Sequence, residues 1–133
     1  MKCLFVKAPF AGYIVDEVKS IEYRTRWTHV RGRIGIIESG TGTVIGDAKL
    51  IGCWKDMKHD GTFDWVLKDA RRYMKPVPFK HKKGAVVWIN LDIDPAMQAI
   101  APSLSVMQLQ ETFQVYGKEL EKFFAERRKE REG

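Results

Sequence analysis

Residues 19–33 read KSIEYRTRWTHVRGR and carry the strongest pattern in this chain. Alternate side chains of a β-strand point to opposite faces of its sheet. One face of this stretch collects the apolar and aromatic side chains: Ile21, Tyr23, Thr25 and Trp27. The other face collects the polar and charged ones: Ser20, Glu22, Arg24 and Arg26. We therefore predict a strand over residues 20–27, with the aromatic face toward the core and the charged face on the surface.

The charged face holds one carboxylate among arginines. Such a face suits an anionic ligand that also has a hydrogen-bonding edge, for example a nucleotide or a stretch of RNA. The alternative is a solvated strand on which Glu22 pairs with Arg24 or Arg26 and binds nothing, because runs of charge usually face water. The sequence leaves both interpretations open.

Positive charge gathers in two segments of the chain. Residues 19–33 have a net charge of +4 and residues 71–83 a net charge of +6, whereas the whole chain has only +6. The basic residues of the second segment are Arg71, Arg72, Lys75, Lys80, Lys82 and Lys83. If the fold brings the two segments together, they form a phosphate-binding surface. Otherwise they are two separate solvated loops.

Length and composition predict one globular domain. The chain has 133 residues, 44% of them hydrophobic, which is enough for a real core. No apolar run approaches the ~20 residues that a membrane span needs. Lys7 and Pro9 interrupt the apolar N-terminus, so it does not read as a signal peptide, and we expect a cytoplasmic protein with no membrane partner. Cys3 and Cys53 lie in apolar runs as free buried thiols, and the Cys and His spacings predict neither a metal site nor a cofactor.

The remaining pattern is mainly β. We expect apolar strands over residues 3–6, 33–38, 43–54 and 85–91, a helix over residues 9–18, and an unassigned element at 65–67. Residues 76–78, Pro-Val-Pro, cannot lie in a central strand. The other tryptophans, Trp54, Trp65 and Trp88, are assigned to the core. The predicted fold class is α+β, mainly β: a small barrel of five to six strands with a helix after the first strand and a helical extension at the C-terminus.

The C-terminal extension begins with a capping box. Ser105 is followed three residues later by Gln108, and apolar residues then recur at spacings of three and four up to Phe123. We expect a domain over residues 1–95 and an amphipathic helix over residues 103–131. We favour a helix packed on its own domain over a dimer seam, so the protein is expected to be a monomer or a weak homodimer.

Four blocks in order resemble the ASCH domain, a member of the PUA-like superfamily named for homology to a transcriptional coactivator. The first is the strand that runs into Lys7-Ala8-Pro9-Phe10 and a helix. The second is Lys19-Ser20-Ile21-Glu22-Tyr23-Arg24, which is similar to the family's Lys-x-x-Glu-x-Arg signature. The third is Arg31-Gly32-Arg33-Ile34-Gly35-Ile36. The fourth is Lys75-Pro76-Val77-Pro78-Phe79 followed by Gly84-Ala85-Val86-Val87-Trp88. The resemblance covers residues 1 to about 92.

The resemblance implies a PUA-like β-barrel with a cleft beside the first helix, and a protein that binds RNA or a modified nucleoside. Some similar small proteins act as amidohydrolases on N4-acetylcytidine, and ribonuclease activity is attributed to others. The implied cleft residues are Lys19, Glu22, Arg24, Pro9, Phe10 and, at the end of the third strand, Ser39. Arg26 and the six basic residues of segment 71–83 complete the candidate binding set by their charge.

One departure from the pattern bears on catalysis. The amidohydrolase-like members carry threonine where this chain has Glu22, so a hydroxyl nucleophile is missing there. Ser20 is displaced by two residues, about 6.5 Å along a strand. Our first hypothesis is therefore an RNA- or nucleoside-binding module. The second is a small hydrolase in which Glu22 is the general base and Lys19 stabilises an oxyanion. The third is a scaffold whose C-terminal helix recruits a partner.

Overall fold

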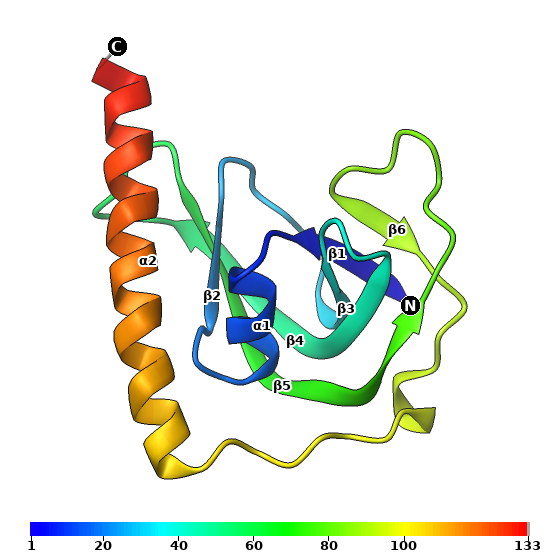
Figure 1. Cartoon of the computed structure of the whole chain (residues 1–133). Helices are drawn as coiled ribbons and strands as arrows, with labels where there is room; N and C mark the ends of the chain where they lie inside the picture. The colour runs from blue at the N-terminus through cyan, green and yellow to red at the C-terminus, as the bar shows by residue number, and fades with distance from the viewer. Residues whose placement is uncertain (133) are drawn as a thin grey trace. The chain divides into compact units, whose positions relative to one another are not determined.

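The computed structural model describes residues 1–132, and the chain divides into two compact units after Pro102. The first unit contains a mixed six-stranded sheet and one short helix, and the second contains a single long helix (Figure 1). The elements of the first unit are β1 (Lys2–Val6), α1 (Phe10–Val15), β2 (Ile21–Arg24), β3 (Gly32–Glu38), β4 (Thr43–Lys55), β5 (Phe63–Pro78), β6 (Trp88–Asn90) and a 3-10 turn (Pro95–Met97). The long helix is α2 (Val106–Glu132).

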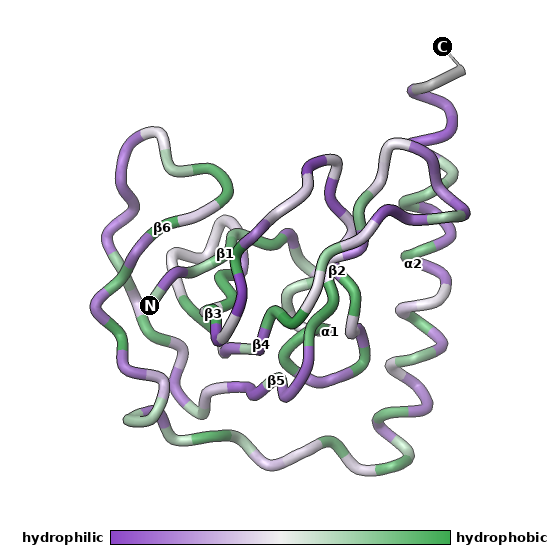
Figure 2. The backbone as a smooth tube through the Cα atoms, turned by 180° about the vertical axis from the view of Figure 1, so that it is seen from behind, coloured by the Kyte–Doolittle hydropathy of each residue, from purple (hydrophilic) through white to green (hydrophobic). Residues whose placement is uncertain are grey.

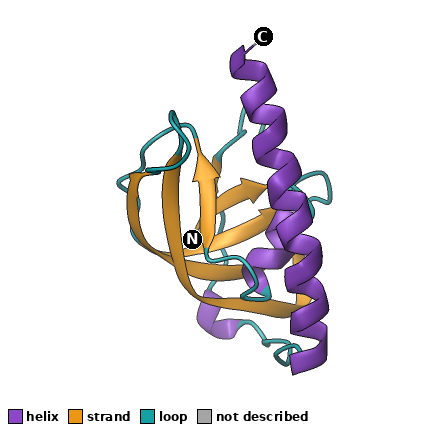
Figure 3. Cartoon of the chain, turned by 90° about the vertical axis from the view of Figure 1, so that its left-hand side faces the viewer, coloured by secondary structure: helices purple, strands orange, loops and turns teal. Residues whose placement is uncertain are grey.

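The strands lie in the order β2-β5-β4-β3-β1-β6. β1 and β3 run parallel and the other ladders are antiparallel. β4 and β5 are long and contain bulges, which increase local twist and bend the sheet (Figure 3). Helix α1 packs on β3, β4 and β5, and the main core fills the space between them.

The predicted barrel is not closed. Within residues 1–132 no strand ladder joins β2 to β1 or β6, so the sheet has two free edges. Side chains link the two sides of the curved sheet instead. The indole of Trp65 on β5 stacks on Trp88 of β6, with centroids 5.8 Å apart and planes 9° apart. Arg24 of β2 donates a hydrogen bond from Nη2 to the carbonyl oxygen of Phe5 on β1, at 2.6 Å. We call this line of side-chain contacts between β2–β5 and β1–β6 the seam.

The expected helix over residues 9–18 is shorter in the structure. Pro9 stands immediately before the helix, and α1 ends at Val15. Glu17 then adopts a positive φ of 61°, and the N–H groups of Val18 and Lys19 both donate to the Tyr13 carbonyl, at 2.9 and 3.0 Å. This left-handed turn closes the helix and sends the chain directly into the Lys19 motif.

The strand expected over residues 20–27 ends at Arg24, and the expected orientation is wrong for Glu22 and Trp27. Glu22 is buried at 7% exposure, whereas Trp27 lies beyond the strand with 52% of its surface exposed. Trp54 was also expected in the core and is 56% exposed, while Trp65 is buried as predicted. The carboxylate of Glu22 therefore turns inward, which costs free energy unless its charge finds a partner.

Two other strands differ in length from the prediction. The unassigned element at 65–67 is the start of the 16-residue β5, which includes Pro76 and Pro78. Among the described residues, β2 pairs with β5 only up to Val66. At Pro76 and Pro78, β5 is therefore paired with β4 alone, so neither proline lies in a central part of the sheet, as predicted. The strand expected over 85–91 is only Trp88–Asn90, because residues 79–87 form a loop in which Val86 is 77% exposed.

The predicted capping box is present at the start of α2, which begins at Val106, three residues after the expected start of the helix at residue 103. The Ser105 N–H donates to Gln108 Oε1 at 2.9 Å, and the Gln108 N–H donates to Ser105 Oγ at 3.3 Å, which is a capping box. Figure 2 shows α2 alternating between hydrophobic and hydrophilic along its length. Whether this helix packs on its own domain or forms a dimer interface stays a prediction. Among the described residues, no helix has the length and apolar character needed to cross a membrane.

Candidate functional site

Lys19, Glu22 and Arg24 converge as an ion-pair cluster at the start of β2. Lys19 Nζ lies 3.2 Å from Glu22 Oε1. Arg24 donates to the other oxygen, Glu22 Oε2, from Nε at 3.0 Å and from Nη2 at 2.8 Å. Both oxygens of the carboxylate are therefore occupied by cations of the protein, and Glu22 fixes the position of both.

The cluster is largely hidden from solvent. Lys19 is 3% exposed and Glu22 7%, whereas the Arg24 side chain keeps 23% of its surface. Lys19 also donates to the Ile21 carbonyl oxygen and lies over two rings, 5.5 Å from the centroid of Phe10 and 4.7 Å from that of Tyr23. The expected open charged face is wrong for Glu22, and Arg24 is the member of the cluster that reaches solvent.

Burial changes the acid–base chemistry of Lys19. Loss of solvation lowers the pKa of its ammonium group below the ordinary value, and the charge and hydrogen bond of Glu22 oppose that shift. A lysine in this setting is closer to the neutral amine than a surface lysine is. That is the form in which an amine acts as a nucleophile or a base.

Arg24 lies at the seam described above. Its Cζ is 5.6 Å from the ring centroid of Trp65, which in turn stacks on Trp88. Its bonds to Glu22 and to the Phe5 carbonyl fix the plane of the guanidinium group. A planar cation that is fixed in this way and partly exposed is a good donor to a phosphate or to the edge of a base.

The basic segment 71–83 serves two purposes in the structure. Arg71 donates to both oxygens of the buried Asp47, from Nε at 2.9 Å and from Nη2 at 2.8 Å. Arg33 also binds this carboxylate, and the Tyr73 hydroxyl donates to it at 2.6 Å. The two basic segments therefore meet at Asp47, where their arginines hold the fold together.

Arg72 likewise pairs inside the protein. Its Nε lies 2.7 Å from Asp16 Oδ1 and its Nη2 2.9 Å from Asp16 Oδ2, which ties the end of α1 to β5. The candidate ligand residues Arg71 and Arg72 thus have structural partners. Lys75 lies exposed on β5.

The remaining lysines of the segment lie in the exposed loop after β5: Lys80, Lys82 and Lys83. The ring of Phe5 holds this loop through edge contacts with His81, at 5.2 Å between centroids, and with Phe79, at 6.0 Å. The carbonyl of the same Phe5 accepts the bond from Arg24. The fold therefore brings the lysine loop beside the seam.

The other candidates lie around this region. Phe10 contacts Lys19 as described, and the preceding Pro9 is exposed. Ser39 is exposed after β3, and its N–H donates to the Val6 carbonyl at 2.9 Å. Arg26 is exposed just past β2, and its carbonyl accepts the Trp65 Nε1–H bond at 2.9 Å.

Two solved structures share this arrangement of strands and helices. They are the crystal structures of ASCH from Zymomonas mobilis and of a tyrosine-to-phenylalanine mutant of that protein. Each is 18% identical to this chain with a TM-score of 0.50, over 85% of this chain and 93% and 96% of theirs, respectively. The chain has the ASCH fold. No protein-family model matches the chain, and no curated protein matches it in sequence.

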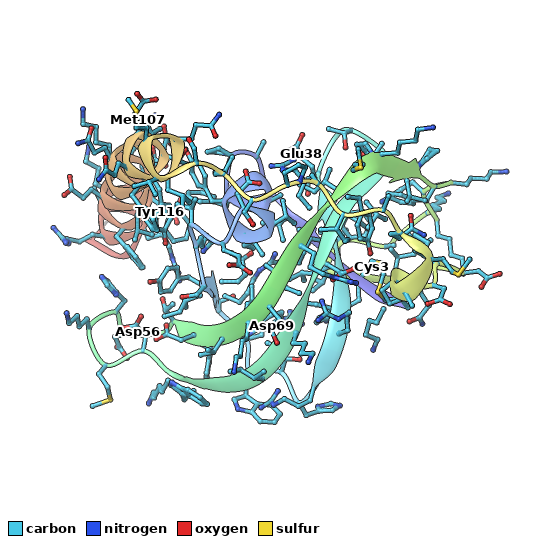
Figure 4. All side chains as sticks on the ribbon, turned by 90° about the horizontal axis from the view of Figure 1, so that it is seen from below. Cys3, Glu38, Asp56, Asp69, Met107 and Tyr116 are labelled. Atoms are coloured by element: carbon cyan, nitrogen blue, oxygen red, sulfur yellow. The ribbon has the colours of Figure 1, made fainter. Side chains whose placement is uncertain are left out.

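The ASCH fold also brings together two acids that the sequence did not single out. Asp56 lies in the loop between β4 and β5 (Figure 4), and Asp64 lies at the start of β5, paired with Tyr23 of β2. Burial and a hydrogen bond with Asp56 raise the pKa of Asp64 to about 6, against the opposing charges of His59 and Lys19. Nothing in the sequence signals this pair, because the turn that joins the two strands sets its geometry. In the described part of the chain, no group of three or more His, Cys, Asp or Glu residues fits a metal ion.

Proposed function

We propose that this ASCH-fold protein binds RNA or a modified nucleoside at the seam. The observation that carries the proposal is the state of Arg24: its guanidinium is fixed by Glu22 and by the Phe5 carbonyl, lies over Trp65 and still reaches solvent. Pre-organised arginine forks suit phosphate oxygens and the acceptor edges of bases.

The surrounding charge supports an anionic ligand. The lysine loop with Lys80, Lys82 and Lys83 is joined to the seam through Phe5, and Arg26 is exposed two residues after Arg24. The chain as a whole carries a net charge of +6. Phosphate contacts from such side chains position a nucleic acid strand, and their contribution falls as salt increases.

In this proposal Glu22 acts through its neighbours. Both of its oxygens are engaged by Lys19 and Arg24, so it orients the Arg24 fork instead of accepting a hydrogen bond from the base. Lys19 is the buried counter-ion of this carboxylate.

A second candidate function is hydrolysis, for which the lowered pKa of Lys19 is the specific observation. An acylated cytidine is one substrate class: the neutral Lys19 amine would take a proton from the water that attacks the acyl carbon. That proton would then pass to the cytosine amino group as the acyl C–N bond breaks, which releases cytidine and the free carboxylic acid. The other substrate class is an RNA phosphodiester. Release of free cytidine from N4-acetylcytidine, or cleavage of a labelled RNA, would distinguish turnover from binding alone. The variant Lys19→Met should abolish either activity.

Fluorescence anisotropy of a labelled single-stranded RNA, measured at two salt concentrations, tests the binding proposal. We expect binding in the micromolar range or tighter that weakens with salt and weakens further in Arg24→Ala. Arg128→Ala is the matched control, since it removes an exposed arginine from α2 in the other unit. Thermal unfolding of each variant verifies that it is folded.

Equal binding by wild type, Arg24→Ala and Arg128→Ala would contradict the assignment of the seam. It would leave only a nonspecific basic surface.

A further inference from the structure

The loop that follows β2 is held rigidly although most of its side chains face solvent. Trp65 donates its indole N–H to the Arg26 carbonyl at 2.9 Å. The Thr28 N–H donates to Cys53 Sγ at 3.5 Å, and the Thr28 hydroxyl accepts a bond from the Val30 N–H at 3.2 Å. Thr28 itself is buried at 6% exposure. These anchors fix residues 25–31, which we call the tryptophan loop.

The tryptophan loop presents an indole that the core does not use. Trp27 is 52% exposed. The Arg31 guanidinium carbon lies 5.6 Å from its ring centroid, and Arg31 is itself oriented by bonds to the Thr28 and Val30 carbonyls at 2.9 and 2.7 Å. The His29 ring lies 5.9 Å away. An arginine that is held on an exposed tryptophan combines a stacking surface with a phosphate-binding cation.

A second exposed tryptophan lies close to this loop. Trp54 is 56% exposed, and its ring lies over Gly52, where an added Cβ would come within 2.5 Å of Cη2. Glycine at position 52 therefore lets the indole lie flat against β4. The Thr28–Cys53 bond joins the residues adjacent to both tryptophans, which puts the Cα atoms of Trp27 and Trp54 within about 13 Å of each other.

Basic residues neighbour both tryptophans in the chain. Arg26 and Arg31 are exposed in the tryptophan loop, and Lys55 follows Trp54. Two acids lie near Trp54: Asp64 is its partner on β5, and Asp56, just after β4, accepts hydrogen bonds from the backbone N–H groups of its own turn. Two exposed indoles, one of them covered by an arginine, form the kind of surface on which bases of a single strand stack while phosphates meet arginines.

We propose that Trp27 and Trp54, with Arg31 and Arg26, form a base-stacking surface for single-stranded RNA. The bound RNA would then continue past Arg24 onto this surface. This inference rests on the proposed function and adds a second contact region to it. Because every base has a π face, the stacking surface tolerates different sequences.

Anisotropy titrations of a labelled single-stranded RNA with Trp27→Ala, Trp54→Ala and the double variant test this inference. We expect each single variant to bind about 5- to 150-fold more weakly than wild type, from the usual contribution of one stacked base. The ratio should stay constant between two salt concentrations, because stacking releases no counterions. Trp27→Phe should recover part of the loss.

Met57→Ala is the matched control, because Met57 is 95% exposed in the adjoining turn and has no ring. If wild type binds, and Trp27→Ala and Trp54→Ala bind as tightly as Met57→Ala, the inference is wrong while the proposed function stands. If wild type does not bind RNA at any salt concentration, this surface and RNA binding at the seam are both refuted.

Discussion

Replacement of Glu22 by alanine should destabilise the protein strongly, because it leaves a buried ammonium without its partner. Lys19 is 3% exposed and has Glu22 as its ion-pair partner at 3.2 Å. Removal of one member of a buried ion pair costs about 3–5 kcal/mol. Arg24 has 23% of its side chain in solvent and can recover hydration, so we expect a loss near the lower limit, about 3 kcal/mol.

Urea unfolding followed by tryptophan fluorescence measures this loss. All four tryptophans, Trp27, Trp54, Trp65 and Trp88, lie in the first unit, so the signal reports the sheet that contains Glu22. A loss of about 3 kcal/mol should lower the melting temperature by about 10 °C. The double variant Lys19→Met/Glu22→Ala should be more stable than Glu22→Ala, because it removes the orphaned charge.

A Glu22→Ala variant within 1 kcal/mol of wild type, at an unchanged slope on urea concentration, would refute this reasoning. It would mean that Lys19 gains water in the variant and that the pair is not truly buried.

Two further predictions concern other parts of the molecule. In the folded protein the pKa of Asp64 is raised from 3.8 to about 6, so its contribution to stability is complete below about 3.8 and is lost as the pH rises through about 6. Between pH 4 and pH 7 the melting temperature of Asp64→Asn should therefore fall less than that of wild type. The exposed control Asp92→Asn should show the same fall as wild type. An equal fall in melting temperature for all three proteins would contradict the raised pKa of Asp64. Gly46→Ala should cost about 1–3 kcal/mol or more, because the new Cβ would come within 2.6 Å of Val15 Cγ1 and closer still to the Arg71 carbonyl oxygen. At Gly117 in α2 an added Cβ meets open space, so Gly117→Ala should instead stabilise the helix by about 1 kcal/mol. Thermal melts followed by circular dichroism measure the stability of both variants. Similar effects of the two substitutions would be inconsistent with the close packing at Gly46.

The order of elements in this fold was largely predictable from the sequence. The apolar runs located β1, β3 and β4, and the capping box located the start of α2. Alternation in residues 20–27 showed which side chains share a face. It did not show which face is inward, because Glu22 and Lys19 neutralise each other and so can be buried.

The parts that were missed depend on partners that are distant in the chain. β5 was not recognised as one strand because charged residues and prolines interrupt its pattern after Leu67, and its bulges break the alternation. The buried carboxylate of Asp47 gathers Arg33 and Arg71 from different strands, which no local pattern encodes. For the same reason the sequence could not separate arginines that hold the fold from Arg24, which reaches solvent at the seam.

The most direct measurement of the central claim is a proton–nitrogen NMR titration of the labelled protein with a short single-stranded RNA and with a free nucleoside. The account predicts that the Arg24 Nε–H signal and the backbone amides of residues 80–83 shift on binding. The Nε–H signal of Arg71, which is bonded to Asp47, should not move. Binding that shifts other signals but leaves Arg24 unchanged would contradict the account, since the ligand would then lie away from the seam.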